Sequence, residues 1–312
     1  MHVSNSESIP SERLIVFVLS FRHSGSTIVG QVLGASPDAV FVGESDRILH
    51  QVAAGARCSC GRLVEECFAV SSDGLPSPDR VRRSFLRLDP LRSPKHLWQI
   101  VTRSVGPLPR ELQPIADAQC SAWATKFESS SVVVDSSKSL RLVAHHCREG
   151  HHQVRIVVVR RDPVSTINSS MRKAATRALS GRSRLRVLAS AYAELARLVI
   201  AEAWMRRVVP RLGVPYCWLS FDNWSDDPAS ATLELTDACK IEPVPLDGRS
   251  VELPSAHVIE GNRRTSGGTV RIRNAERGDE AVRPPLPALA RLLTRTVGNE
   301  SGSPDWDGRP PS

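Results

Sequence analysis

The residues best suited to bind an anion form a short polar segment directly after an apolar run. The run from Leu14 to Leu19 is apolar and rich in branched side chains, which predicts a buried strand. The residues after it that could contact an anion are Arg22, His23, Ser24, Gly25, Ser26 and Thr27. A helix-compatible run follows, so the loop and the first helical N–H groups should converge on one point of positive potential. The segment is predicted to bind a phosphate-like group, although a plain strand-to-helix turn without a ligand stays open.

The spacing of this segment almost matches the phosphate-binding loop of nucleoside triphosphatases. That loop would need a glycine at position 20 and a lysine at position 26, where this chain has Ser20 and Ser26. Without the lysine, the main positive charge on a triphosphate is missing. The loop is therefore predicted to hold a phosphate-like group without serving transfer from a triphosphate.

A second strand and helix offer another anion site. Residues 154–159 are apolar and predict a strand, and Asp162 and Pro163 are typical of the cap and first residue of the helix after it. Arg161 at the strand end and Ser169 on the helix could then contact one phosphate.

These two segments resemble the nucleotide-binding elements of sulfotransferases that use 3′-phosphoadenosine 5′-phosphosulfate (PAPS). Residues 22–27 resemble the family's 5′-phosphosulfate loop, in which His23 stands where lysine or arginine is usual. In the 3′-phosphate element, the family's arginine falls on Arg161 and its serine on Ser169.

Three further segments extend the resemblance over roughly residues 13–275. Residues 132–139 are similar to the family's strand that ends in a lysine-containing loop, and residues 36–44 to the segment with the catalytic glutamate in tyrosylprotein and several bacterial sulfotransferases. Residues 257–273, with Asn262 and Arg263, resemble a loop that closes over the 3′-phosphate in bacterial members.

The resemblance implies a role for each matched residue. Glu44 would be the general base, with His23 as a weaker alternative, and Lys138 would contact the bridging oxygen as negative charge develops. Glu44 could instead favour the start of a helix over 46–54, and Lys138 could be a solvated loop residue. The expected contacts of PAPS, and of its product 3′-phosphoadenosine 5′-phosphate (PAP), are Arg22, His23, Ser24, Gly25, Ser26, Thr27, Arg161, Ser169, Asn262 and Arg263.

The order of the elements predicts an α/β, P-loop-like three-layer fold with a central parallel sheet flanked by helices. The expected strands cover residues 14–20, 39–42, 131–134, 154–160 and 214–220, and a packing helix covers about 185–209. We expect one domain over 13–298, in which an insertion at 55–125 shapes the acceptor site. Residues 1–12 and 299–312 are expected to be disordered tails.

The composition limits the partners and the compartment. The 312 residues carry a formal net charge of +8, but the arginines are scattered and no nucleic-acid motif is present. No stretch approaches the length of a membrane span, and the polar start of the chain does not resemble a signal peptide. We therefore expect a cytoplasmic protein with reduced cysteines, no nucleic-acid partner and no membrane span.

One cysteine cluster has no role in this scheme. Cys58, Cys60 and Cys67 could bind zinc with His50 or another ligand, or form a disulfide, but the usual C-x₂-C pair is absent and no metal site is assigned. Similar stretches in related bacterial sulfotransferase-like proteins imply a feature of the lineage. The histidine pairs 145–146 and 151–152 are interpreted as parts of charged surfaces.

The expected function is transfer of a sulfuryl group from PAPS to a hydroxyl or amine of a small-molecule acceptor, without a required metal. Two alternatives remain. One is a P-loop-type small-molecule kinase, in which residues 132–135 would hold magnesium. The other is a nucleotide-binding protein without catalytic activity.

Overall fold

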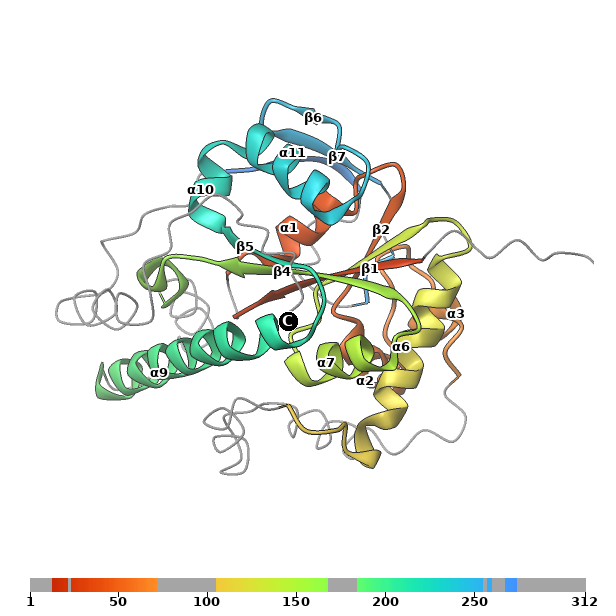
Figure 1. Cartoon of the computed structure of the whole chain (residues 1–312), viewed down its shortest axis with the longest axis horizontal. Helices are drawn as coiled ribbons and strands as arrows, with labels where there is room; N and C mark the ends of the chain where they lie inside the picture. The colour runs from red at the N-terminus through yellow and green to blue at the C-terminus, as the bar shows by residue number, and fades with distance from the viewer. Residues whose placement is uncertain are drawn as a thin grey trace, which may run out of the picture.

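Five parallel strands form the central sheet in the described part of the chain (Figure 1). The structure is a computed structural model that describes residues 13–21, 24–71, 105–167, 184–254, 257–259 and 267–273. The strands are β1 (Leu14–Ser20), β2 (Ala39–Gly43), β3 (Val132–Asp135), β4 (Gln153–Arg160) and β5 (Tyr216–Ser220). They lie in the order β2-β3-β1-β4-β5, and every neighbouring pair is parallel. The expected α/β architecture with a central parallel sheet is confirmed.

Helices cover both faces of this sheet. One face carries α1 (Ser26–Leu33), α10 (Phe221–Asp226) and α11 (Pro228–Cys239) (Figure 1). The opposite face carries α2 (Ile48–Ala53), α3 (Val64–Phe68), α6 (Gln113–Lys126), α7 (Leu140–Glu149) and α9 (Arg184–Val208). Short 3₁₀ turns precede α2 (η1, Ser45–Arg47) and α6 (η3, Arg110–Leu112) and follow α9 (η4, Val209–Arg211).

The strand β1 shows why this sheet is buried on both sides. Its side chains alternate between the two cores: Ile15, Phe17 and Leu19 pack on one face, and Leu14, Val16 and Val18 pack on the other. All seven residues of β1 are buried. A parallel strand covered by helices on both faces needs such an uninterrupted apolar run, and this run made the strand predictable.

A second, antiparallel sheet lies on the α1 side and was not expected from the sequence. It contains β6 (Leu246–Asp247), β7 (Ser250–Leu253) and β8 (Gly268–Arg271). The buried Val251 and Leu253 join the core that contains α1 and α11. Between β7 and β8, the Ile259 backbone N–H donates to the Val42 carbonyl of β2 at 3.0 Å, so this late segment contacts an outer strand of the main sheet.

Most expected element boundaries agree with the structure within two residues, with exceptions in the helices. The expected helix over 46–54 is a 3₁₀ turn followed by α2. In α9, the buried positions include Leu195, Leu198 and Met205, whereas Tyr192 is exposed. Asp162 caps a helix that begins at Pro163, as predicted, and Asp227 caps α11 at Pro228 in the same way.

The assignment of both histidine pairs to charged surfaces is wrong for His146. This side chain is 6% exposed, and its ring centroid lies 4.5 Å from that of Trp123. Burial lowers the pKa of His146 to about 3, so the ring is neutral near pH 7. His151 is exposed, in agreement with the expectation.

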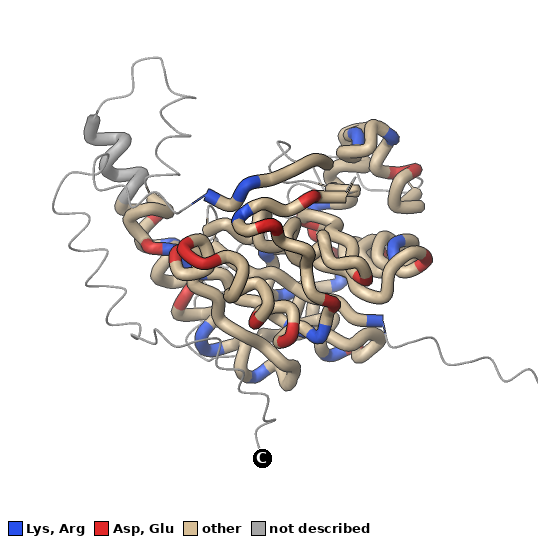
Figure 2. Tube along the Cα trace, turned by 90° about the horizontal axis from the view of Figure 1, so that it is seen from above, with Lys and Arg blue, Asp and Glu red and all other residues tan. Residues whose placement is uncertain are grey.

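Several expectations lie partly or wholly outside the described residues. The predicted tails, 1–12 and 299–312, and residues 72–104 of the expected insertion belong to this group. In the described part of the chain, no helix combines the length and apolar character that a membrane crossing needs. Figure 2 shows basic and acidic residues interspersed over the described chain.

Candidate functional site

The polar residues singled out in the sequence gather where the parallel strands end. Ser20 closes β1, Glu44 follows β2, Asp135 closes β3 and Arg161 follows β4. The strand order places these ends in the sequence Glu44, Asp135, Ser20, Arg161 along one edge of the sheet. Ligands of open parallel sheets bind at this edge, so these residues define the candidate site.

The loop between β1 and α1 has the geometry of a tight turn into a helix. Gly25 has φ +92°, a conformation that side chains disfavour, and the Val29 N–H bonds back to its carbonyl at 3.1 Å. A Cβ on Gly25 would lie 2.3 Å from ring atoms of Phe221, so only glycine fits against this ring. Ser24 and Ser26 are buried and Thr27 is half-buried. Arg22 and His23 lie outside the described residues.

The start of α1 retains the positive potential that attracts an anion. The first turn of α1 contains no acidic residue and receives no hydrogen bond from a side-chain cap. Among the described residues, the buried Ser20 and Ser136 hydroxyls, at the ends of the neighbouring strands β1 and β3, also have no hydrogen-bond partner. Buried hydroxyls are normally paired, so a ligand is a natural partner for these two.

The end of β4 lies beside this loop because β1 and β4 are neighbours. The guanidinium carbon of Arg161 lies 5.2 Å from the Phe221 ring centroid, a cation–π distance. The ring of Phe221 therefore packs on both Gly25 and Arg161. The backbone N–H of Asp162 donates to the Asp222 carboxylate at 2.6 Å, which fixes the chain after Arg161. Ser169, the second expected 3′-phosphate contact, lies outside the described residues.

A bulge at the end of β2 turns the chain toward Glu44. The pairing of β2 with β3 shifts register between Phe41 and Gly43, and Gly43 has φ +83°. Such bulges re-aim the next side chain. The Gly43 carbonyl accepts from the Ser136 N–H at 2.8 Å, so β2 and β3 stay joined at this point.

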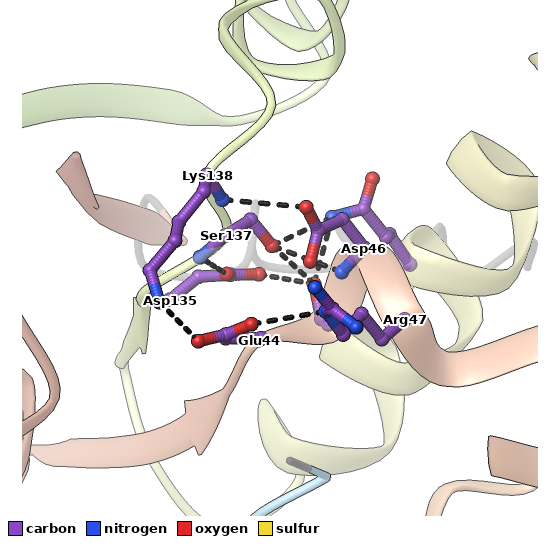
Figure 3. Close-up of polar contacts among 8 residues, drawn as sticks. Glu44, Asp46, Arg47, Asp135, Ser137 and Lys138 are labelled. Atoms are coloured by element: carbon purple, nitrogen blue, oxygen red, sulfur yellow. Dashed lines mark hydrogen bonds and ion pairs between the residues drawn. The ribbon is translucent and has the colours of Figure 1, made fainter. Parts of the chain in front are cut away.

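Glu44 lies between two cations (Figure 3). One carboxylate oxygen is ion-paired and hydrogen-bonded with the Lys138 ammonium, and the other lies 3.1 Å from Nε of Arg47. The Glu44 side chain is 10% exposed, whereas those of Lys138 and Arg47 are 27% and 25% exposed. The structure thus brings together the predicted base and the predicted cation in one ion pair.

A buried network fixes the loop that presents Lys138. The carboxylate of Asp135 accepts from the Ser137 N–H at 2.7 Å and the Trp123 indole N–H at 3.0 Å, and it also accepts from the Ser45 hydroxyl. Burial raises the pKa of Asp135, while these hydrogen bonds oppose the rise. Because the donors come from η1, α6 and the loop itself, the network joins three segments beside the Glu44–Lys138 pair.

Asp46 is a second buried acid in this network. Its backbone N–H donates to the Ser137 hydroxyl at 2.9 Å, and its carboxylate accepts from the Lys138 N–H at 3.3 Å. Burial, and after it the charges of Glu44 and Asp135, raise the pKa of Asp46 to about 7. Asp46 therefore changes protonation near neutral pH, a few atoms from Lys138.

Gln119 connects the network to the core. Its amide donates to the Ser45 hydroxyl at 2.7 Å and the Ser137 hydroxyl at 3.3 Å, and its carbonyl lies 3.2 Å from Nε2 of His146. For the Gln119 carbonyl to accept a hydrogen bond from His146, the proton of the neutral imidazole must lie on Nε2. Neutral His146 thus orients the amide that holds the two serines.

Residues expected to close the site from the C-terminal side are only partly described. Asn262 and Arg263 lie outside the described residues, but His257 in the same segment is described. His257 lies beside the cysteines, with its Nδ1 2.9 Å from Sγ of Cys67. His50, the histidine considered from the sequence, is not part of this group.

Sequence reasoning missed the residues that hold the site together across long separations. No local motif marks Phe221, Gln119 or His146. Only their positions at a strand end or on a helix face could have identified them as candidate site residues. Asp46 entered the sequence analysis only as the first residue of the expected helix over 46–54. A signal did exist for Phe221, because it directly follows the β5 run and thus had to lie at the same sheet edge.

Comparison with known proteins adds no assignment to this geometry. No protein-family model matches the chain, and a search of curated proteins finds no match.

Proposed function

We propose that the protein is a sulfotransferase that moves a sulfuryl group from PAPS to a hydroxyl or amine of a small acceptor. The observation that carries the proposal is the Glu44–Lys138 ion pair at the sheet edge, next to the loop of residues 24–27. A base for the acceptor and a cation for the leaving group are the two functions that such a transfer requires.

The strand order supports an assignment of the ligand's parts. Residues 24–27 and Arg161 follow the adjacent strands β1 and β4, which are about 4.8 Å apart. They would hold the 5′- and 3′-phosphates of the nucleotide, with Phe221 packed beneath both segments. The Glu44–Lys138 pair lies on the other side of β1, where the acceptor would approach.

The transfer step follows from these positions. Glu44 takes the proton from the acceptor as the acceptor oxygen or nitrogen attacks sulfur. The bond between sulfur and the bridging oxygen breaks, and PAP leaves with the electron pair. Lys138 moves from Glu44 toward this oxygen and neutralises its charge. Before the reaction, the ion pair with Glu44 holds the Lys138 ammonium close to the bridging oxygen.

The kinase alternative is less well supported by this geometry. Asp135, the residue that would hold magnesium, is fully buried and its oxygens accept hydrogen bonds from Ser45, Ser137 and Trp123. Position 26 also lacks the lysine of a triphosphate loop. A binding protein without catalysis is favoured by one observation: both oxygens of Glu44 are already in ion pairs.

Calorimetry and a transfer assay separate the three functions. We expect PAP to bind more tightly than ATP, and sulfate from labelled PAPS to appear on a member of a panel of phenols, alcohols and amines. Tighter ATP binding with magnesium-dependent phosphate transfer would favour the kinase. PAP binding with no transfer to any acceptor, and no slow hydrolysis of PAPS, would favour the binding protein.

A further inference from the structure

A cluster of soft metal ligands lies outside the candidate site. In the described part of the chain, Sγ of Cys58, Cys60 and Cys67 and a ring nitrogen of His257 all lie within 4.8 Å of one another. The cysteines come from the segment before and within α3, whereas His257 lies 190 residues after Cys67. The fold, not a local motif, brings these four side chains together.

The distances within the cluster resemble the edges of a metal tetrahedron. Thiolates bound to zinc at about 2.3 Å lie about 3.8 Å apart, and a thiolate lies about 3.6 Å from a coordinating imidazole nitrogen. The observed distances are 3.8 Å between Sγ of Cys60 and Cys67, and 3.9 Å between Sγ of Cys58 and Nδ1 of His257. Sγ of Cys67 lies 2.9 Å from Nδ1 of His257, which is shorter than such an edge, so these two side chains must move apart when an ion binds.

Backbone hydrogen bonds hold the first two cysteines on one tight turn. The Cys58 N–H donates to the Arg62 carbonyl and the Gly61 N–H to the Cys58 carbonyl, both at 2.9 Å. The Arg57 guanidinium also donates to the Gly61 carbonyl at 2.7 Å. This turn presents Cys58 and Cys60 toward α3, where Cys67 lies one turn into the helix.

The segment of His257 is fixed to the same turn by other contacts. The Val258 N–H donates to the Ser59 hydroxyl at 3.0 Å, and the Ile259 N–H donates to the Val42 carbonyl at 3.0 Å. Ile259 is 3% exposed and belongs to the core on this face. The imidazole is therefore held at the cysteines by its own backbone.

The charge around the cluster suits thiolates. Three thiolates, one neutral imidazole and a divalent ion sum to −1. The buried ammonium of Lys126 lies 3.9 Å from Sγ of Cys67 and 3.0 Å from the Cys67 carbonyl. A buried cation at this distance offsets the remaining negative charge.

We propose that Cys58, Cys60, Cys67 and His257 bind one zinc ion in a structural site. Three thiolates and an imidazole are soft and borderline ligands that select zinc over magnesium or calcium, and four protein ligands leave no position for a substrate. The thiol protons pass to solvent when the ion binds. The ion joins the chain after β7 to the segment between α2 and α3, next to the end of β2 that presents Glu44.

The first test is metal content and thiol protection of the unmodified, untagged protein. We expect about one zinc per chain after purification from zinc-supplemented cells. Cys60 is exposed, so it should react quickly with an alkylating reagent only after a chelator removes the ion. The half-buried Cys120 and Cys147 serve as internal references whose reactivity should not depend on the chelator.

Variants then assign the ligands. We expect His257→Ala and Cys60→Ser each to lower zinc content to near zero, whereas the exposed control His151→Ala retains it. If the variants fail to fold, cobalt substitution of the unmodified protein replaces them, and the visible bands of a tetrahedral cobalt–thiolate centre are expected. A zinc-poor protein, Cys60 that reacts equally with and without chelator, or a disulfide among the three cysteines would overturn the proposal. None of these readouts involves sulfate transfer, so the proposal stands or fails independently of the proposed function.

Discussion

At the scale of a single residue, a substitution of Arg161 tests whether this side chain contacts the 3′-phosphate of the nucleotide. We expect Arg161→Ala to weaken PAP binding by on the order of 2–4 kcal/mol, because a charge-assisted contact to the 3′-phosphate is lost. Adenosine 5′-phosphosulfate, which lacks this phosphate, should lose much less affinity. Calorimetry with both ligands measures the difference.

The matched control is the preceding residue. Arg160 pairs with Glu202 of α9 at 2.5 Å, and α9 packs on the opposite face of the sheet from α1. Arg160→Ala should change PAP affinity little. Equal losses for PAP and adenosine 5′-phosphosulfate in Arg161→Ala would show that this arginine does not contact the 3′-phosphate.

Glu44 tests the transfer step. Glu44→Gln should keep PAP affinity within about twofold and lower turnover by ~10²–10⁴, the usual loss when a general base is removed. The amide oxygen can still accept from Lys138, so the loop should keep its position. Glu149→Gln, which changes an exposed glutamate on α7, is the control. Turnover that survives in Glu44→Gln would reduce Glu44 to an ion-pair partner and make His23 the next residue to change.

Asp46 links the site to the stability of the fold. Its pKa rises on folding from 3.8 to about 7, so the folded state holds a proton that the unfolded state releases. This contribution to stability is complete below about pH 4 and is lost as the pH rises through about 7. Asp46→Asn should therefore abolish the fall in the free energy of unfolding between about pH 4 and pH 7, which is on the order of 2–4 kcal/mol.

Unfolding by denaturant from pH 5 to pH 8 measures the effect of Asp46→Asn. The informative quantity is the slope of the free energy of unfolding against pH. The absolute free energy is less informative, because a buried asparagine amide also needs a hydrogen-bond acceptor and changes the stability at every pH. His146 contributes with the opposite sign: its lowered pKa costs stability as the pH falls below 6.5. The exposed Asp117→Asn should keep the parental slope, and so would Asp46→Asn if the pKa of Asp46 were ordinary.

At the scale of elements, the junction of β1 and α1 depends on one close approach. Gly25→Ala combines a positive φ with a contact of 2.3 Å to the Phe221 ring. We expect it to cost about 1–3 kcal/mol of stability and to weaken PAP binding at least about tenfold, because the ring and Arg161 must shift. Thermal unfolding and calorimetry measure the two effects separately.

Gly30→Ala in the same helix is the control for folding damage. Its Cβ would lie 2.5 Å from the Phe41 ring, on the side of α1 that faces β2. It should lower stability by a similar amount but leave PAP affinity unchanged. A Gly25→Ala protein that binds PAP normally would show that the loop does not contact the nucleotide.

The sequence was informative about elements and less so about their long-range contacts. The apolar runs of β1 and β4 and the cap at Asp162 are local signals, and they predicted these elements within two residues. The hydrogen bonds of Gln119 and the approach of His257 to Cys67 join residues far apart in the chain, so no local pattern contains them. Glu44 and Lys138 each follow a predicted strand, and parallel strands end at a common edge, so the sequence could place these two residues at the same edge.

At the scale of the whole molecule, a chelator separates the two proposals. Sulfate transfer should continue in EDTA over the time of an assay, because Lys138 and Arg161 supply the positive charge at the site. Prolonged chelation should lower the thermal midpoint instead, since the cysteine cluster loses its ion. Turnover that stops at once and returns with magnesium would contradict the metal-independent reaction.

The hydrogen bond from the Ile259 N–H to the Val42 carbonyl also affects strand pairing between two copies of the chain. β2 is the last strand on its side of the sheet, and an outer strand with free backbone groups is a template for a strand from another molecule. The segment around Ile259 occupies part of that border with the chain's own backbone. A protein shortened before His257 would uncover the border beside Gly43, and strand exchange between molecules would then compete with folding. The late segment, which carries a ligand of the proposed zinc ion, is therefore also expected to limit strand pairing between molecules at this border.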